Sequence, residues 1–142
     1  AEAVGACLSD EATALREADV ISNHMNLTGE NERFFDYARF CRMEKHPIFL
    51  NVSRGGSMVE TDLVRALDER LVRAAGLDVL EAEKPDLSRC ALVGRENVII
   101  TPHAAFYSSQ SIEALQRISC RNLTGCLTGR WELVFRVVNG VF

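Results

Sequence analysis

The sequence predicts an α/β protein built on an incomplete doubly wound parallel sheet with helices on both faces. Short apolar runs, such as Pro47–Leu50 and Asn97–Thr101, alternate with segments whose apolar residues recur at helical spacing. The runs are almost continuously apolar instead of alternating with polar residues. This pattern is typical of parallel strands that are covered by helices.

Four strands and four helices are expected along the chain, and they largely alternate. The strands are expected at 19–24, 48–52, 74–79 and 97–101. The helices are expected at 9–17, 31–41, 60–70 and 109–125, with Ser9 as the N-cap of the first. The order of elements therefore favours parallel strands joined by crossover connections.

Composition limits the classes of function. The chain has 142 residues, 47% hydrophobic and 25% charged, which is typical of a single globular domain. A net charge of −4 without a Lys/Arg-rich run argues against a nucleic-acid partner, and no apolar run has the length of a membrane span. The five cysteines have no metal-ligand spacing and indicate a reduced, cytoplasmic protein without a metal site: Cys7, Cys41, Cys90, Cys120 and Cys126.

Charged residues and a histidine follow the ends of the predicted strands. Arg54 follows strand 48–52, and Asp78 ends the next strand, with Glu81 and Glu83 close behind. His103 follows the last strand. Because ligands of open parallel sheets bind outside the carboxyl ends of the strands, we expect these side chains to converge on one site.

These residue types suit the chemistry of a small 2-hydroxy or 2-oxo acid. The planar fork of an arginine can hold a carboxylate through two parallel hydrogen bonds. A histidine beside a carboxylate can exchange the hydroxyl proton near neutral pH. The set therefore indicates a site that anchors an organic acid and moves a proton.

Each of these residues also has a structural interpretation. Arg54 can be a solvated corner, T-P-H an ordinary loop, and the two glutamates part of an exposed turn. His46 precedes a proline and is interpreted as structural. His24 is left open between packing at the core edge and contact with a cofactor. Joint placement at one edge of the sheet favours the functional interpretation.

Four segments, in this order and at these distances, resemble the NAD-binding domain of the D-isomer-specific 2-hydroxyacid dehydrogenases. They are ADVISNHMNLT, IFLNVSRGG, AAGLDVLEAE and NVIITPHAAFYSS, within about residues 9–128. The resemblance implies a Rossmann-like fold and an NAD-dependent oxidoreductase that exchanges a hydride between NAD(H) and a D-2-hydroxy acid or 2-oxo acid. HAAFYSS resembles the D-lactate and D-2-hydroxyisocaproate dehydrogenase branch.

The resemblance also implies the catalytic residues. The family's catalytic arginine lies in a strand-end N-x-x-R-G motif, which here gives Arg54. Its acidic residue lies five positions after the Asp of an L-D-V motif, which gives Glu83 instead of Glu81. Its acid/base histidine lies in T-P-H, which gives His103.

Cofactor contacts are implied in the same way, and Asp78 matches the family's aspartate near the nicotinamide ring. The cofactor is expected to be NAD, with NADP left open. Family members usually have Pro at the position of Asn26 and often Thr at that of Val52, so these two side-chain contacts differ here. The implied cofactor-binding residues are Met25, Asn26, Asn31, Val52, Ser53, Arg54, Asp78 and His103.

The sequence contains no G-x-G-x-x-G motif, so the phosphate-binding turn and most of a substrate domain are expected upstream. We therefore expect residues 1–128 to be the C-terminal part of an NAD-binding domain that is inactive alone. Residues 129–142 are expected to be a tail that packs on the missing substrate domain.

The resemblance further implies a homodimer. The alternative function is a non-catalytic Rossmann-like module for binding or dimerisation. A glycine fingerprint upstream of this sequence would decide for the enzyme.

Overall fold

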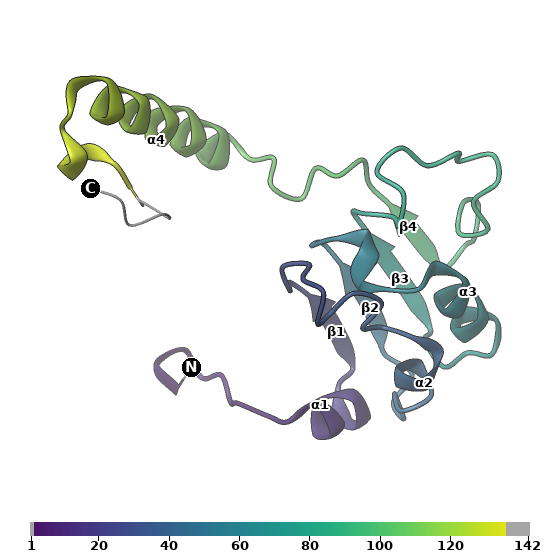
Figure 1. Ribbon diagram of the computed structural model, residues 1–142. Coiled ribbons are helices and arrows are strands. Elements are labelled where there is room, and N and C mark those ends of the chain that lie inside the picture. Colours follow the sequence, from purple (N-terminus) through teal and green to yellow (C-terminus); the bar gives the residue numbers. More distant parts are fainter. Residues whose placement is uncertain (1, 136–142) are drawn as a thin grey trace. The chain divides into compact units, whose positions relative to one another are not determined.

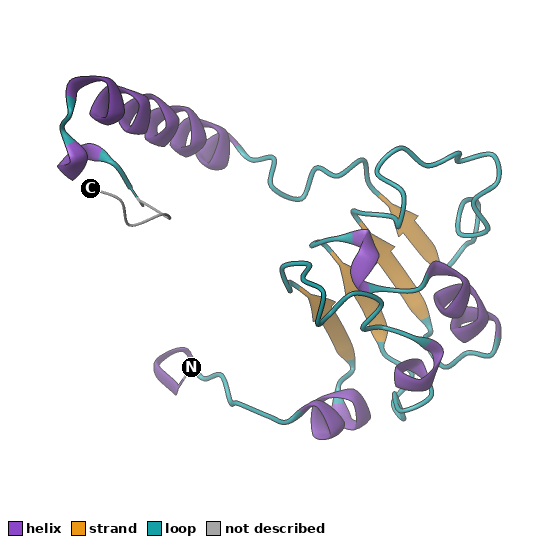
Figure 2. Cartoon of the chain, viewed as in Figure 1, coloured by secondary structure: helices purple, strands orange, loops and turns teal. Residues whose placement is uncertain are grey.

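The computed structural model describes residues 2–135 and confirms the predicted fold class. Four strands form one parallel sheet in the order β1-β2-β3-β4 (Figures 1 and 2). They are β1 (Val20–Asn23), β2 (Ile48–Asn51), β3 (Ala74–Leu77) and β4 (Val98–Ile100). The α-helices are α1 (Glu11–Glu17), α2 (Tyr37–Phe40), α3 (Glu60–Asp68) and α4 (Ser109–Thr128), and the 3₁₀ helices are η1 (Glu2–Val4), η2 (Gly55–Ser57) and η3 (Trp131–Leu133).

The chain divides into two compact units between Ala105 and Phe106. The first unit holds the whole sheet with α1, α2 and α3. The second unit holds α4 and η3. All the residues that the sequence predicts for the site lie in the first unit.

The strand register gives the sheet one core face. Ile21, Phe49, Ala75 and Val98 are aligned across the four strands and point to the same side. The helices of the first unit contribute to this core, in which Phe49 is fully buried. Ile99 points to the opposite side and is 70% exposed. The buried side chains from the helices are Leu15, Phe40, Leu63, Ala66 and Leu67.

The predicted helix at 31–41 is wrong over most of its length, because only α2 is helical there. The backbone of residues 33–35 pairs instead with residues 56–59. Phe35 N–H donates to the Ser57 carbonyl at 2.9 Å, and Val59 N–H donates to the Phe35 carbonyl at 3.0 Å. Asp36 then caps α2 by accepting a hydrogen bond from Arg39 N–H. The free energy gained by burying Phe35 in this extended conformation outweighs the helical propensity of the segment.

The N-cap of the first helix is Asp10 and not the predicted Ser9. Asp10 accepts hydrogen bonds from the backbone N–H and the hydroxyl of Thr13, at 2.9 and 3.0 Å. Ser9 donates only to the Asp10 carbonyl. A carboxylate at the N-cap also interacts favourably with the helix dipole, which explains why the aspartate takes this place.

In the second unit, Gly129 caps the C-terminus of α4, and its positive φ of 69° is the left-handed conformation that glycine adopts readily. The chain then returns along the helix, and Phe135 N–H donates to the Asn122 side chain at 2.8 Å. Part of the predicted tail thus contacts α4, and residues 136–142 lie outside the described residues. Packing of the tail on a substrate domain stays a prediction.

None of the helices within residues 2–135 combines the length and hydrophobicity needed to cross a membrane.

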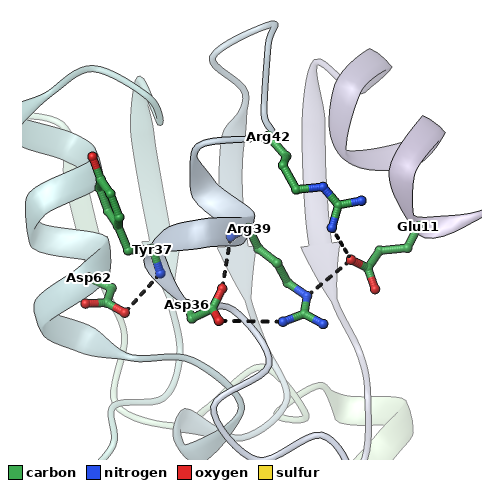
Figure 3. Close-up of polar contacts among 6 residues, drawn as sticks. All are labelled: Glu11, Asp36, Tyr37, Arg39, Arg42 and Asp62. Carbon is green, nitrogen blue, oxygen red and sulfur yellow. Dashed lines mark hydrogen bonds and ion pairs between the residues drawn. The ribbon is translucent and has the colours of Figure 1, made fainter.

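Exposed ion pairs join α1 to α2 and to Arg42, which follows α2 (Figure 3). Glu11 accepts hydrogen bonds from Arg39 at 3.2 Å and from Arg42 at 2.7 Å. The three side chains are 28–46% exposed. Water therefore screens these pairs, and they contribute little stability beside the apolar contacts of the same helix.

We expect Glu11→Gln to lower the free energy of unfolding by less than about 1 kcal/mol, with an effect that shrinks further at high salt. Phe40→Ala, in the helix that Glu11 contacts, is expected to cost about 3–5 kcal/mol because it opens a cavity in the core. Urea unfolding of the two variants measures both values. A larger loss for Glu11→Gln than for Phe40→Ala would contradict this ranking.

Candidate functional site

The carboxyl ends of β2, β3 and β4 border one cleft of about 830 Å³ in the first unit. Arg54 follows β2, Asp78 follows β3, and His103 follows β4. Glu81 and Glu83 lie in the loop that begins after Asp78 and also line the cleft. The structure thus brings together the four charged residues and the histidine that the sequence predicts for one edge of the sheet.

A buried polar network holds the loop that carries Arg54. The Arg54 carbonyl accepts hydrogen bonds from the Asn51 side chain at 3.1 Å and from the Ser57 hydroxyl at 2.6 Å. Asn23, from the neighbouring strand, donates to both Asn51 Oδ1 and Ser57 Oγ, at 3.1 and 2.6 Å. Asn23, Asn51 and Ser57 are at most 2% exposed. The backbone of Arg54 is therefore fixed from beneath, while its side chain remains exposed.

Gly55 lets this loop approach the loop after β3. A Cβ atom at Gly55 would lie 1.8 Å from the Leu80 carbonyl oxygen and 2.7 Å from Glu81 N. No side chain fits at this position without moving backbone. The glycine beside Arg54 therefore permits contact between two of the loops that form the cleft.

Asp78 is buried, and its carboxylate holds the turn after β4. Oδ1 accepts hydrogen bonds from the Thr101 hydroxyl at 2.5 Å and from Ala104 N–H at 2.8 Å. Oδ2 accepts a third from Ala105 N–H at 2.8 Å. Burial by itself raises the pKa of Asp78, but these hydrogen bonds, with His103 nearby, hold the pKa below its usual value.

His103 lies within this turn with a φ of 54°, in the left-handed region. That conformation costs a non-glycine residue about 1–2 kcal/mol, so surrounding contacts must impose it. The imidazole is exposed and lines the cleft. Backbone strain at a residue that faces a cleft is common at functional sites.

Glu83 is exposed on the wall of the cleft, and no hydrogen bond or ion pair joins it to His103 within residues 2–135. The backbone N–H of Glu81 donates to the carboxylate of Glu60, which ties the start of this loop to α3. The proposed partnership of Glu83 with His103 stays a prediction.

The remaining predicted cofactor residues lie in the loops after β1 and β2. The Ser53 hydroxyl donates to the Met25 carbonyl and joins these two loops. Asn31 donates to the Asn26 carbonyl at 2.6 Å and accepts from Thr28 N–H, so its amide closes its own loop. Val52 is 36% exposed. The side chain of Asn31 is thus already engaged, whereas that of Val52 is accessible.

The other histidines differ in their surroundings. His24 is exposed and its Nε2 lies 2.8 Å from the Ser22 hydroxyl, so it does not pack at the core edge. His46 lies at the opposite, amino-terminal side of β2 with a φ of 49°. Within the described residues, no group of three His, Cys, Asp or Glu side chains could hold a metal ion.

The sequence did not predict structural roles for Asn23, Asn51, Ser57 and Thr101. A signal exists for the first two, because each is the polar last residue of a strand and they are paired in register. Polar residues at such positions must find partners when the strand is buried. Ser57 and Thr101 carry no comparable pattern, since their roles depend on where the loops fold.

A parallel sheet whose strand ends carry these side chains defines a Rossmann-like nucleotide-binding architecture. A sequence model described as "D-isomer specific 2-hydroxyacid dehydrogenase, NAD binding domain" matches residues 1–105, which are the first unit. The chain belongs to this family.

Individual relatives agree with this assignment. The D-lactate dehydrogenase of Streptococcus agalactiae is 35% identical over 114 residues, covering 72% of this chain and 34% of that protein. The chloroplastic D-3-phosphoglycerate dehydrogenase 2 of Arabidopsis thaliana is 36% identical over 139 residues, covering 98% of this chain and 22% of that protein. The chain thus spans 34% and 22% of the length of these two relatives.

A solved structure shares the fold. The crystal structure of D-lactate dehydrogenase from Aquifex aeolicus, complexed with NAD and lactic acid, superposes with a TM-score of 0.81 at 28% identity. The superposition covers 89% of this chain and 42% of that one.

We expect Gly55→Ala to lower the free energy of unfolding by about 2–3 kcal/mol, because its Cβ must displace backbone atoms of the neighbouring loop. Gly56→Ala is the matched control. Its Cβ meets only the end of the Leu27 side chain, at 3.0 Å, which can rotate away. Denaturant unfolding compares the two. Equal losses would contradict the close approach at Gly55.

Proposed function

We propose that this chain is the C-terminal part of the NAD-binding domain of an NAD-dependent D-2-hydroxyacid dehydrogenase. The enzyme exchanges a hydride between NAD(H) and a small D-2-hydroxy acid or the corresponding 2-oxo acid. One observation carries the proposal: Arg54, Glu83 and His103 come from three different strand-end loops and line the same cleft. A module used only for binding or dimerisation has no need of this combination.

Arg54 is proposed to bind the carboxylate of the substrate. Its guanidinium donates to the Ser53 carbonyl at 2.8 Å, and no carboxylate within residues 2–135 forms an ion pair with it. The planar fork is therefore available for two parallel hydrogen bonds to an organic acid. Such binding fixes the carbonyl or hydroxyl carbon in one orientation.

His103 is proposed to exchange the proton of the 2-hydroxyl group. Its imidazole is exposed on the cleft and can reach a bound molecule without rearranging the core. Glu83 is proposed as its acidic partner. Catalytic hydrogen bonds are often long before the substrate binds, so a separated pair in the free protein is compatible with this role.

NAD supplies the hydride acceptor or donor in this proposal. The cleft edge fits the nicotinamide end of the cofactor, because an acid/base residue and an anion-binding arginine lie beside accessible loops after β1 and β2. The residues that would contact NAD are Met25, Asn26, Asn31, Val52, Ser53, Arg54, Asp78 and His103.

We also propose that the enzyme is a cytoplasmic homodimer. The family resemblance supports the dimer. Free thiols at all five cysteines support a reducing compartment.

We expect Arg54→Lys in the complete enzyme to raise KM for the 2-oxo acid by roughly 10- to 100-fold, because lysine keeps the charge but loses the bidentate fork. The measurement is steady-state oxidation of NADH at varied 2-oxo acid concentration. Arg89→Lys is the control, because Arg89 is an exposed arginine that does not line the cleft. Unchanged kinetics in Arg54→Lys would return Arg54 to the role of a solvated corner.

We expect His103→Gln to reduce kcat by about 10²- to 10⁴-fold, the usual contribution of a general acid. Calorimetry is expected to show NADH binding within about threefold of that of the enzyme without the substitution, because the other proposed NAD contacts remain.

Glu83→Gln is expected to lower kcat/KM through the same histidine. Glu81→Gln, two residues earlier in the same loop, is expected to leave kcat/KM unchanged. If Glu81→Gln lowers activity and Glu83→Gln does not, the acidic partner is Glu81.

A further inference from the structure

The orientation of His103 depends on its backbone. Its imidazole has no hydrogen-bond partner within residues 2–135, and it projects from a turn in the left-handed conformation. Within the turn itself, His103 N–H donates a hydrogen bond to the Thr101 carbonyl at 3.0 Å. Other contacts must therefore maintain this unfavourable conformation.

Asp78 provides these contacts from the neighbouring strand. One carboxylate binds the residue two positions before His103 and the two residues after it, through Thr101, Ala104 and Ala105. The three hydrogen bonds thus bracket the histidine on both sides. They use three of the roughly four acceptor positions of a carboxylate, so about one remains for a contact from outside the chain.

Asp78 and the first residue of the turn, Thr101, are both anchored in the sheet. Asp78 N–H donates to the Asn51 carbonyl at 2.9 Å and extends the pairing of β2 with β3. Thr101 N–H donates to the Leu77 carbonyl at 2.9 Å and extends the pairing of β3 with β4. The carboxylate and the turn are therefore held at a fixed separation by the strands that carry them.

Burying the charge of Asp78 costs free energy, and its hydrogen bonds to the turn offset this cost. Asp78 is 4% exposed, and no ion pair with Lys, Arg or His neutralises it within the described residues. A buried charge of this kind requires strong hydrogen bonds, and only N–H and O–H groups of the turn supply them. The lowered pKa of Asp78 agrees with a carboxylate that is stabilised in its charged form.

We propose that Asp78 is the positioning residue for His103: its carboxylate imposes the left-handed turn that presents the imidazole to the cleft. The proposal rests on the proposed function for the role of His103 as proton donor. It deepens that function by assigning to Asp78 an effect on turnover that is transmitted through His103 and is separate from any contact with NAD.

The structural test uses the 142-residue chain with Asp78→Asn. An asparagine presents an NH₂ donor where the carboxylate accepted a hydrogen bond, so at least one N–H group of the turn loses its partner. NMR is expected to show loss of the left-handed signature of His103 in its backbone coupling constant and Cα shift. Amide exchange of Ala104 and Ala105 is expected to accelerate by roughly tenfold or more.

Three further variants separate positioning from general destabilisation. Thr101→Val removes one donor and is expected to change the His103 signals partially, whereas Thr101→Ser keeps the hydroxyl and is expected to preserve them. Asp86→Asn is the matched control, because Asp86 holds a different turn by accepting hydrogen bonds from Ser88 N–H and hydroxyl. It removes the same charge and should leave His103 unchanged. If Asp78→Asn lowers the melting temperature but leaves the His103 signature and the two amides unchanged, the proposal is overturned.

The kinetic test is a double-mutant cycle in the complete enzyme. If Asp78 acts through His103, then Asp78→Asn lowers kcat strongly in the presence of His103 and adds less than about threefold to the loss in His103→Gln. Multiplicative losses would overturn the proposal, because they would mean that Asp78 acts independently, as a cofactor contact does. If the enzyme without substitutions has no dehydrogenase activity, the proposed function is contradicted. The NMR result would still decide whether Asp78 sets the conformation of the turn.

Discussion

Buried polar groups at the strand ends must be hydrogen-bonded, and the arrangement of the cleft depends on this constraint. Asn23 and Asn51 end β1 and β2, Asp78 follows β3, and all three are at most 4% exposed. Within residues 2–135, no buried side-chain nitrogen or oxygen lacks a partner. Apart from the contacts of Asn23 with Asn51 and Met25, the partners lie in the loops that carry Arg54 and His103. The free energy that would be lost by leaving these groups unpaired therefore fixes the two loops.

The two loops are held by different chemistry, and the difference matches the conformations they adopt. Neutral amides and a hydroxyl hold the Arg54 carbonyl, and Gly55 removes the steric obstacle to loop contact without strain in φ. The turn at His103 has no glycine and adopts a left-handed conformation. Charge-assisted hydrogen bonds are roughly twice as strong as neutral ones, so a carboxylate suits the more strained segment.

Much of the first unit could be predicted because its signals are local. Continuous apolar runs located the four strands, and helical spacing located α3, whose buried residues Leu63 and Leu67 lie on the expected face. The positions just after the strands led to the residues that line the cleft. The partners of Asn51 and Asp78 could not be predicted, because a sequence shows that a buried polar group needs a partner but not which loop provides it. Ser9 and Asp10 show the same limit, since both can cap a helix and the structure selects one.

The one large error in the predicted secondary structure falls on a segment that supports the site. Residues 33–35 were expected to be helical, yet their backbone pairs with the segment that follows Arg54. Arg33 N–H donates to the Gly56 carbonyl at 2.8 Å, and Phe35 pairs with Ser57 and Val59. A helix here would satisfy its own N–H groups and leave those carbonyls without partners. The Arg54 loop is therefore held on one side by the Asn23–Asn51–Ser57 network and on the other by an extended segment. Local helical propensity is overruled where the chain must build the support for its functional loop.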